Sequence, residues 1–259
     1  MSANTKIQLQ NVKKSFGSKT VLNGIDLSVN QGESMVIIGG SGTGKSVMLK
    51  CILGLMSPDS GKVIIDNQNV GDFNAQDRQN MMRKFGMLFQ GGALFDSMKV
   101  WENIAFGLVQ GQQMPKDQAH DIAIQKLQQV GLTAQTGDLF PAEISGGMQK
   151  RVSLARAIAT NPEIIFFDEP TTGLDPIMAD VINNLIVDCV KDLGATAVTI
   201  THDMTSARKI ADHVAMIYEG KIIWNGDVKE LHDSKNSYVD QFIHGRADGP
   251  ITKHAKFKA

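Results

Sequence analysis

Residues 39–46 read Gly-Gly-Ser-Gly-Thr-Gly-Lys-Ser, a pattern suited to holding a chain of phosphates between an apolar run and a helical segment. Glycines let successive backbone N–H groups converge on phosphate oxygens, and a helix N-terminus adds partial positive charge. We expect Lys45 to reach the terminal phosphates and the Ser46 hydroxyl to ligate Mg²⁺. The alternative is a glycine-rich turn followed by a chance Lys-Ser pair. The expected phosphate-binding residues are Gly39, Gly40, Ser41, Gly42, Thr43, Gly44, Lys45 and Ser46.

Two adjacent carboxylates, Asp168 and Glu169, end the apolar run at 164–167. Two acids at the end of a buried strand are costly unless a cation or a reaction uses them. Both can reach a crevice above the carboxyl edge of a parallel sheet. We expect Asp168 to bind Mg²⁺ through its water shell and Glu169 to act as the general base on an attacking water. An exposed acidic turn before Pro170 is the alternative.

A second anion site is predicted at Ser145-Gly146-Gly147, where a helix opens. A serine at the N-cap followed by two glycines leaves backbone N–H groups unpaired at a helix N-terminus. Taken alone this is an ordinary helix cap. Its place shortly before the acidic strand favours a role in anion binding.

Hydrophobic periodicity indicates an α/β fold that positions these sites. Alternating strands come first and predict an antiparallel lobe, and later strands alternate with helices, which predicts parallel βαβ units in a doubly wound core. The expected strands are residues 7–12, 21–27, 34–38, 62–65, 85–89, 163–167, 197–200 and 214–218. The expected helices are residues 45–53, 101–109, 116–130, 177–193 and 204–210. The helical stretch at about 92–151 is the candidate inserted lobe, and after Lys235 we expect one short amphipathic helix before order fades at Gly249-Pro250.

Composition narrows the class of protein further. The 259 residues suit one large domain with a small inserted lobe. With 26 Lys+Arg against 27 Asp+Glu, the chain lacks the net positive charge that nucleic-acid binding usually needs, so we expect no nucleic-acid partner. Its start lacks a secretory signal and its apolar runs are too short to span a bilayer, so we expect it to stay in the cytosol. Cys51 and Cys189 are predicted to be buried thiols without a disulfide.

The order of these motifs resembles the ATP-binding cassette (ABC) family along nearly the whole chain. Residues 39–46 resemble its Walker A motif, 144–149 its signature and 164–169 its Walker B motif, while 173–175 resemble its D-loop. Met148 stands where the family usually has Gln, which leaves Ser145 and the glycines intact. The resemblance implies a P-loop NTPase cassette with a RecA-like core, an antiparallel β lobe and an inserted helical subdomain.

The resemblance also assigns roles to four further residues, each with a plainer alternative. Gln90 matches the Q-loop glutamine, a ligand of Mg²⁺ and water, although alone it would be a surface polar residue. His202 matches the H-loop histidine that contacts the γ-phosphate, although a core histidine is the alternative. Phe16 matches the aromatic that stacks on adenine, or it packs in the core. Asp175 matches a D-loop contact across a dimer, or it is a turn residue before Pro176.

The implied mechanism needs two copies of the chain. One copy holds ATP at residues 39–46, and Ser145 to Gly147 of a second copy close over the γ-phosphate, so a head-to-tail dimer encloses two nucleotides. Lys45, Gln90, Glu169 and His202 are then the catalytic set. The alternatives are a solute importer with the same motifs, a cassette ATPase acting on DNA or ribosomes, and a nucleotide-binding module without hydrolysis.

A narrower resemblance, to the MlaF-like ATPases of bacterial phospholipid transport, rests on residues 88–98, 100–103, 145–148 and 241–251. It implies an ATPase on the cytoplasmic face of the inner membrane that powers lipid movement. The implied partners are a membrane permease with a coupling helix near Gln90, a STAS-domain protein and a periplasmic lipid-binding subunit. We expect an ATPase domain at 1–245 and a tail at 246–259 that docks, with an exposed Phe242 before it, on a neighbouring subunit; a frayed end is the alternative.

Overall fold

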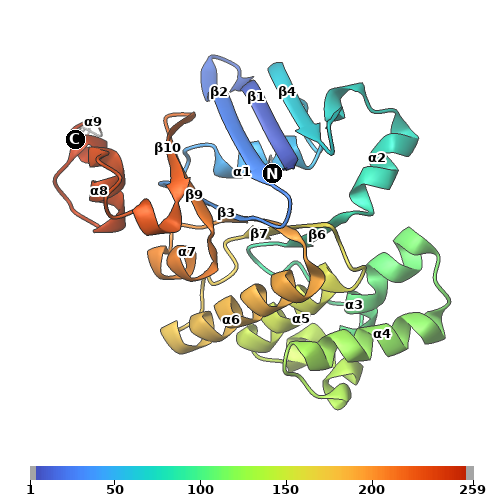
Figure 1. The fold of residues 1–259 in the computed structure, drawn as a ribbon. Helices are drawn as coiled ribbons and strands as arrows, with labels where there is room; N and C mark the ends of the chain where they lie inside the picture. Colours follow the sequence, from blue (N-terminus) through green and yellow to red (C-terminus); the bar gives the residue numbers. More distant parts are fainter. Residues whose placement is uncertain (1–3, 255–259) are drawn as a thin grey trace.

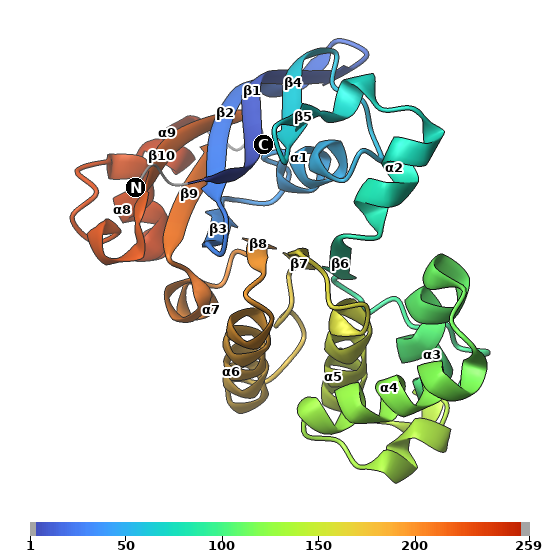
Figure 2. The same cartoon turned by 45° about the vertical axis from the view of Figure 1, so that its right-hand side comes forward.

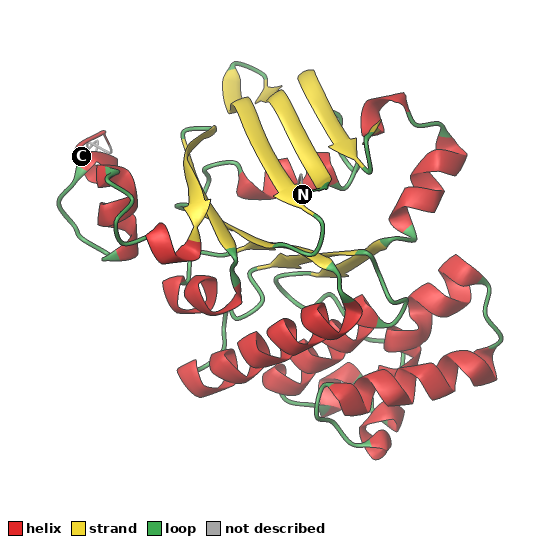
Figure 3. Ribbon diagram, in the orientation of Figure 1, coloured by secondary structure: helices red, strands yellow, loops and turns green. Residues whose placement is uncertain are grey.

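Two β-sheets face each other across helix α1 (Lys45–Ile52) in the computed structural model, which describes residues 4–254 (Figure 1, Figure 3). The smaller sheet has the strand order β2-β1-β4-β5, with antiparallel pairing throughout. Its strands are β1 (Thr5–Phe16), β2 (Lys19–Asn30), β4 (Ser60–Ile65) and β5 (Gln68–Asn69). The predicted antiparallel lobe is confirmed, with strands that extend beyond the expected ranges.

The larger sheet has the order β10-β9-β3-β8-β7-β6, in which all pairs are parallel except β9 with β10. Its strands are β3 (Ser34–Ile38), β6 (Phe85–Leu88), β7 (Ile164–Asp168), β8 (Thr196–Ile200), β9 (His213–Tyr218) and β10 (Lys221–Asp227). Alternate residues of one strand enter opposite cores: Ile37 packs with the α1 side and Ile38 with the helices below. Burial on both faces explains the continuous apolar runs in the sequence.

Helices cover the lower face of this sheet (Figure 1). The helices on this side of the molecule are α3 (Val100–Phe106), α4 (Lys116–Gln129), α5 (Gly146–Ile158), α6 (Pro176–Leu193) and α7 (Met204–Ile210). Figure 2 shows α3 and α4 beyond the β6 edge of the sheet, beside α5. Helix α5 runs continuously through residue 151, where the expected lobe boundary falls. A π-helical turn (Gly107–Gly111) replaces the last residues of the helix expected at 101–109.

Several elements differ from the predictions or were not predicted. Helix α2 (Ala75–Met82) and strands β5 and β10 are additional, and short 3₁₀ turns connect the larger elements. These turns are Val70–Asp72, Ala134–Asp138, Pro141–Glu143 and Val228–Glu230. Within the described residues, no helix has both the length and the apolar character needed to cross a bilayer. Cys51 and Cys189 are buried free thiols, as predicted.

The C-terminal segment folds back on the core. Helix α8 (Ser237–Ile243) buries Val239 and Ile243 in the lower core, and Phe242 packs against the same cluster. Helix α9 (Pro250–His254) begins at the residues where order was expected to fade, so the described chain continues as a helix to its last residue. Phe242 is half-buried rather than exposed, because α8 covers the β9–β10 edge of its own chain. Residues 255–259 of the predicted docking tail lie outside the described part.

Candidate active site

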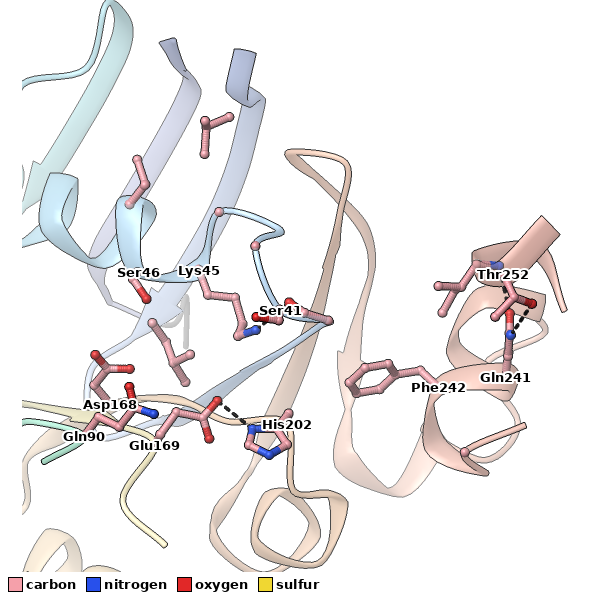
Figure 4. A pocket seen from close by; sticks show the side chains of 18 of the residues that line it. Ser41, Lys45, Ser46, Gln90, Asp168, Glu169, His202, Gln241, Phe242 and Thr252 are labelled. Carbon is pink, nitrogen blue, oxygen red and sulfur yellow. Dashed lines mark hydrogen bonds and ion pairs between the residues drawn. The ribbon is translucent and has the colours of Figure 1, made fainter. Parts of the chain in front are cut away.

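A cleft of about 840 Å³ lies above the carboxyl ends of the parallel strands (Figure 4). Chain connections place Gly39 after β3, Gln90 after β6, Glu169 after β7 and His202 after β8. Four of the predicted site segments therefore meet at one edge of one sheet, as expected for an α/β fold.

The loop between β3 and α1 has the conformation of an anion cradle. Gly44 caps α1 with φ +106°, and a Cβ there would lie 2.9 Å from Leu22 Cδ2 and 3.0 Å from the Val21 carbonyl. No side chain caps this helix, so its first N–H groups are left for a ligand. The buried Lys45 Nζ donates to the carbonyls of Gly39 and Gly40 at 2.7 and 2.9 Å. These features match a site for the phosphates of a nucleotide.

Glu169 leaves the strand in a left-handed conformation, with φ +49°. This conformation is costly for a residue with a Cβ, and it concentrates at functional sites. It turns Glu169 toward the cleft beside Asp168, although neighbouring residues of a regular strand point to opposite faces. The alternative of an exposed acidic turn is wrong, since Glu169 is only 8% exposed.

Three side chains hold the Glu169 carboxylate in place. His202 Nδ1 lies 2.9 Å from Oε1, and the hydroxyls of Thr172 and Thr201 donate to Oε2 at 3.2 and 3.3 Å (Figure 4 draws the His202 contact). The sequence predicted His202 here but missed both threonines, although Thr201 directly precedes the histidine. The His202 side chain is 62% exposed, so it is not a core histidine. A fixed carboxylate with an open histidine beside it is suited to orienting a water molecule.

Charges of both signs meet around the acid pair. Burial, and then the negative charge of Glu169, raise the pKa of Asp168 against the opposing charges of Lys45 and Lys150. Burial lowers the pKa of Lys45, while the charges of Glu169 and Asp168 act in the other direction. The sequence did not indicate Lys150, which lies on α5. Lys150 is buried, and burial lowers its pKa, while the charges of Asp168 and Glu169 act in the other direction.

The predicted Mg²⁺ ligands Ser46, Gln90 and Asp168 all line the cleft (Figure 4). Within residues 4–254, no group of three His, Cys, Asp or Glu side chains gathers as a dedicated metal site would need. Mg²⁺ instead commonly takes one or two carboxylates together with substrate phosphates and water. A hydroxyl, an amide and one carboxylate beside an anion cradle therefore fit a Mg²⁺ that arrives with a nucleotide.

The remaining predicted residues lie outside the cleft lining. Phe16 is 49% exposed at the end of β1, with Lys14 Nζ 5.8 Å from its ring centroid, so core packing is wrong and stacking on adenine stays a prediction. Ser145 caps α5, its Oγ accepting from Met148 N at 3.3 Å, and is exposed. Asp175 caps α6 through the N–H groups of Ile177 and Met178, both at 3.0 Å. For Ser145 and Asp175, contacts with a second copy remain predictions.

The C-terminal helices form one wall of the cleft, which the sequence did not predict. Figure 4 shows Gln241, Phe242 and Thr252 across the cleft from the phosphate loop, and Gly245, Arg246 and Ile251 also line it. Gln241 joins α8 to α9, because its amide donates to Arg246 O and Thr252 Oγ1 and accepts from Ile251 N. The apolar pattern of α8 alone could not show which surface it covers.

Known proteins are similar to this chain in sequence and architecture. Residues 22–172 match the ABC transporter family. The chain is 37% identical to the intermembrane phospholipid transport system ATP-binding protein MlaF of Escherichia coli K12, covering 95% of this chain and 91% of that protein. It is 39% identical to the chloroplastic protein TRIGALACTOSYLDIACYLGLYCEROL 3 of Arabidopsis thaliana (95% and 75%) and to the probable ribonucleotide transport ATP-binding protein mkl of Mycobacterium leprae (97% and 72%).

The solved structures that resemble this chain are also ATP-binding cassettes. A dimeric ATP-binding cassette in a post-hydrolysis state, bound to ADP and phosphate, superimposes with a TM-score of 0.78 at 31% identity, covering 86% of this chain and 98% of that one. The cassette cbiO1 of Clostridium perfringens, part of the ABC transporter complex cbiONQ, gives 0.81 at 28% identity, with 90% and 92% covered.

Proposed function

The chain belongs to the ABC transporter family as an ATPase subunit, and we propose that it hydrolyses MgATP in the cleft to power phospholipid transport. The observation that carries the catalytic part is the Glu169 carboxylate, fixed by His202, Thr172 and Thr201 next to the phosphate loop. A buried, oriented carboxylate near a phosphate site is placed to act on a nucleophilic water.

The proposed step transfers the terminal phosphoryl group of ATP to water. The water oxygen forms a bond to the γ-phosphorus, the bond from that phosphorus to the β,γ-bridging oxygen breaks, and Glu169 accepts the proton of the water. Lys45 and the N–H groups at the start of α1 hold the phosphates. Ser46, Gln90 and, through the water shell, Asp168 would hold the Mg²⁺ of MgATP, which would offset the phosphate charge.

A second copy of the chain completes the proposed site. Ser145, Gly146 and Gly147 open α5 away from the cleft of their own copy, so their N–H groups are free to meet the γ-phosphate bound by a partner. Dimeric forms of the related cassette support this arrangement. Asp175, at the start of α6, is the proposed second contact across the dimer.

Phospholipid is the proposed cargo because the names of the Escherichia coli and Arabidopsis relatives refer to lipids. We place the chain on the cytoplasmic face of the bacterial inner membrane, bound to a permease, with a STAS-domain protein and a periplasmic lipid-binding subunit in the complex. The name of the mycobacterial relative, a probable ribonucleotide transport ATP-binding protein, favours a second candidate, an ATPase subunit that serves a soluble solute.

The first experiment tests catalysis with Glu169→Gln. We expect ATP binding to persist and turnover to fall about 10²–10⁴-fold, the usual contribution of a positioned base. Glu219→Gln is the matched control, because Glu219 also follows a strand and has a similar φ of +46°. Full ATPase activity in Glu169→Gln would refute the assignment of Glu169.

The second experiment tests the cargo. The tagged chain is purified from membranes with its bound proteins, reconstituted in vesicles and assayed for ATP-driven transfer of labelled phospholipid. We expect the parent complex to transfer phospholipid when ATP is added, and the complex with Glu169→Gln to transfer none. A complex that carries a solute-binding protein and moves no lipid would favour the solute transporter instead.

A further inference from the structure

Side chains on one face of α5 form hydrogen bonds with the main chain that follows β6. Lys150 Nζ donates to the Gln90 carbonyl, and Ser153 Oγ donates to the Gly92 carbonyl at 3.1 Å. Arg156 donates to the carbonyls of Gly92 and Ala93, both at 2.6 Å. Lys150, Ser153 and Arg156, which we call the α5 clamp, are spaced by three residues and so share one face of the helix.

The α5 clamp holds a stretch of main chain that has two consecutive residues with positive φ. Gly92 and Ala93 both have positive φ values, +76° and +48°. A Cβ on Gly92 would lie 2.8 Å from Ser153 Oγ, so the loop and the helix are in close contact. Lys150 is 7% exposed and Ser153 is fully buried. Water therefore cannot readily replace these hydrogen bonds if one of them is lost.

Lys150 is the member of the clamp that bonds Gln90, a residue of the cleft lining. Its charge interacts with those of Asp168 and Glu169, while its hydrogen bond holds the main chain of Gln90. The Gln90 side chain is exposed at the cleft and has no hydrogen bond to any described residue, so its position depends on the backbone that carries it.

We propose that Lys150 is a positioning residue for ATP hydrolysis, which holds Gln90 over the cleft and joins it to the helix that begins at Ser145. The inference rests on the proposed function, in which Gln90 serves the nucleotide of its own copy and Ser145 that of the partner. Since both are tied to α5, displacement of one displaces the other. The clamp thus connects the two nucleotide sites of the dimer within each chain.

The test compares Lys150→Met with Lys150→Arg in the full-length chain. For Lys150→Met we expect a kcat that falls between about tenfold and 100-fold, the cost of a misplaced group, while the affinity for ATP without Mg²⁺ stays unchanged. The Mg²⁺ concentration for half-maximal turnover should rise. Lys150→Arg keeps a positively charged hydrogen-bond donor, so its kcat should stay within about threefold of that of the parent. Lys126→Met is the matched control, because Lys126 is also partly buried but bonds Asn161 on a remote surface.

Amide hydrogen exchange over residues 90–93 supplies a readout that does not need activity. It should increase in Lys150→Met, and also in the milder Ser153→Ala, but not in Lys126→Met. Unchanged exchange, or a Lys150→Met chain with the kcat and Mg²⁺ dependence of the parent, would overturn the proposal. If the parent chain had no ATPase activity, the proposed function would be refuted instead. Amide hydrogen exchange over residues 90–93 would still show whether the α5 clamp holds this loop.

Discussion

At the scale of single residues, Thr201 connects Glu169 with the turn that carries His202. Its hydroxyl is fully buried, donates to Glu169 Oε2 at 3.3 Å and accepts from Asp203 N at 3.0 Å. Asp203 in turn caps α7. The hydroxyl therefore fixes the carboxylate and also the turn that carries His202.

We predict that Thr201→Val lowers kcat about tenfold with little change in ATP affinity, because the base loses one of its orienting donors. Steady-state ATPase kinetics and nucleotide titration measure the two effects. Thr196→Val is the control at the start of β8, the strand that Thr201 follows, where among the described residues a buried hydroxyl accepts only from Gly32 N, at 2.9 Å. It should cost about 1 kcal/mol of stability without slowing turnover. Equal kcat values for the two variants would contradict the role of Thr201.

The sequence predicted those site residues that a motif places directly after a parallel strand. Gln90, Asp168 and His202 reach the same cleft because parallel strands end at one edge. Thr172 and Lys150 could not be predicted, since their roles depend on the turn at Glu169 and on how α5 packs. The positive φ of Glu169 was equally hidden, because Glu has no intrinsic preference for that conformation.

At the scale of elements, strands buried on both faces were predictable and marginal ones were not. Helix α2 is defined by its capping box, in which Asn74 Oδ1 accepts from Asp77 N, and it buries only Met81. It has no apolar stripe, so periodicity missed it. Strand β10 lies at the sheet edge and is half-exposed along most of its length, so its pattern does not alternate.

Four charged residues tie the small sheet to the large one. Lys6 in β1 contacts Asp66 at 2.7 Å and Glu163 at 2.5 Å, and Lys84 contacts Asp66 at 2.7 Å. Burial alone would raise the pKa of Asp66, but hydrogen bonds from Lys6 and Lys84 outweigh it and lower the pKa below the usual value of an aspartate. Such a group stabilises the fold above its unfolded pKa and loses the effect as pH falls through its folded pKa.

We predict that Asp66→Asn lowers the free energy of unfolding by about 1–2 kcal/mol at neutral pH, since two charge-assisted hydrogen bonds weaken at a partly exposed site. Urea denaturation at several pH values measures it. The difference from the parent should shrink once the pH drops below about 4, where the unfolded Asp66 is protonated. Asp138→Asn removes only the exposed partner of Lys99 and serves as the control. A constant difference down to acid pH would exclude this network as its source.

At the scale of the whole molecule, the sequence predicted the order of the lobes but not how the chain end is placed. An amphipathic segment such as 238–243 can cover its own core or a partner, and composition does not distinguish the two. Here Val239 and Ile243 are buried within the chain, while Phe242 and Arg246 face the cleft. Truncation after Lys235 would therefore expose core as well as remove any docking surface.

The last prediction separates a composite site from a self-contained one. Lys45→Ala disables the phosphate loop and Ser145→Arg blocks the exposed start of α5, so each variant alone should be inactive. If each site joins the loop of one copy to the α5 start of the other, a mixed dimer has one site with both changes and one with neither. Random mixing makes about half of the dimers mixed, so ATPase activity should recover to about one quarter of the parent value. If loop and helix acted within one copy, every copy would carry a defect and mixing would restore nothing.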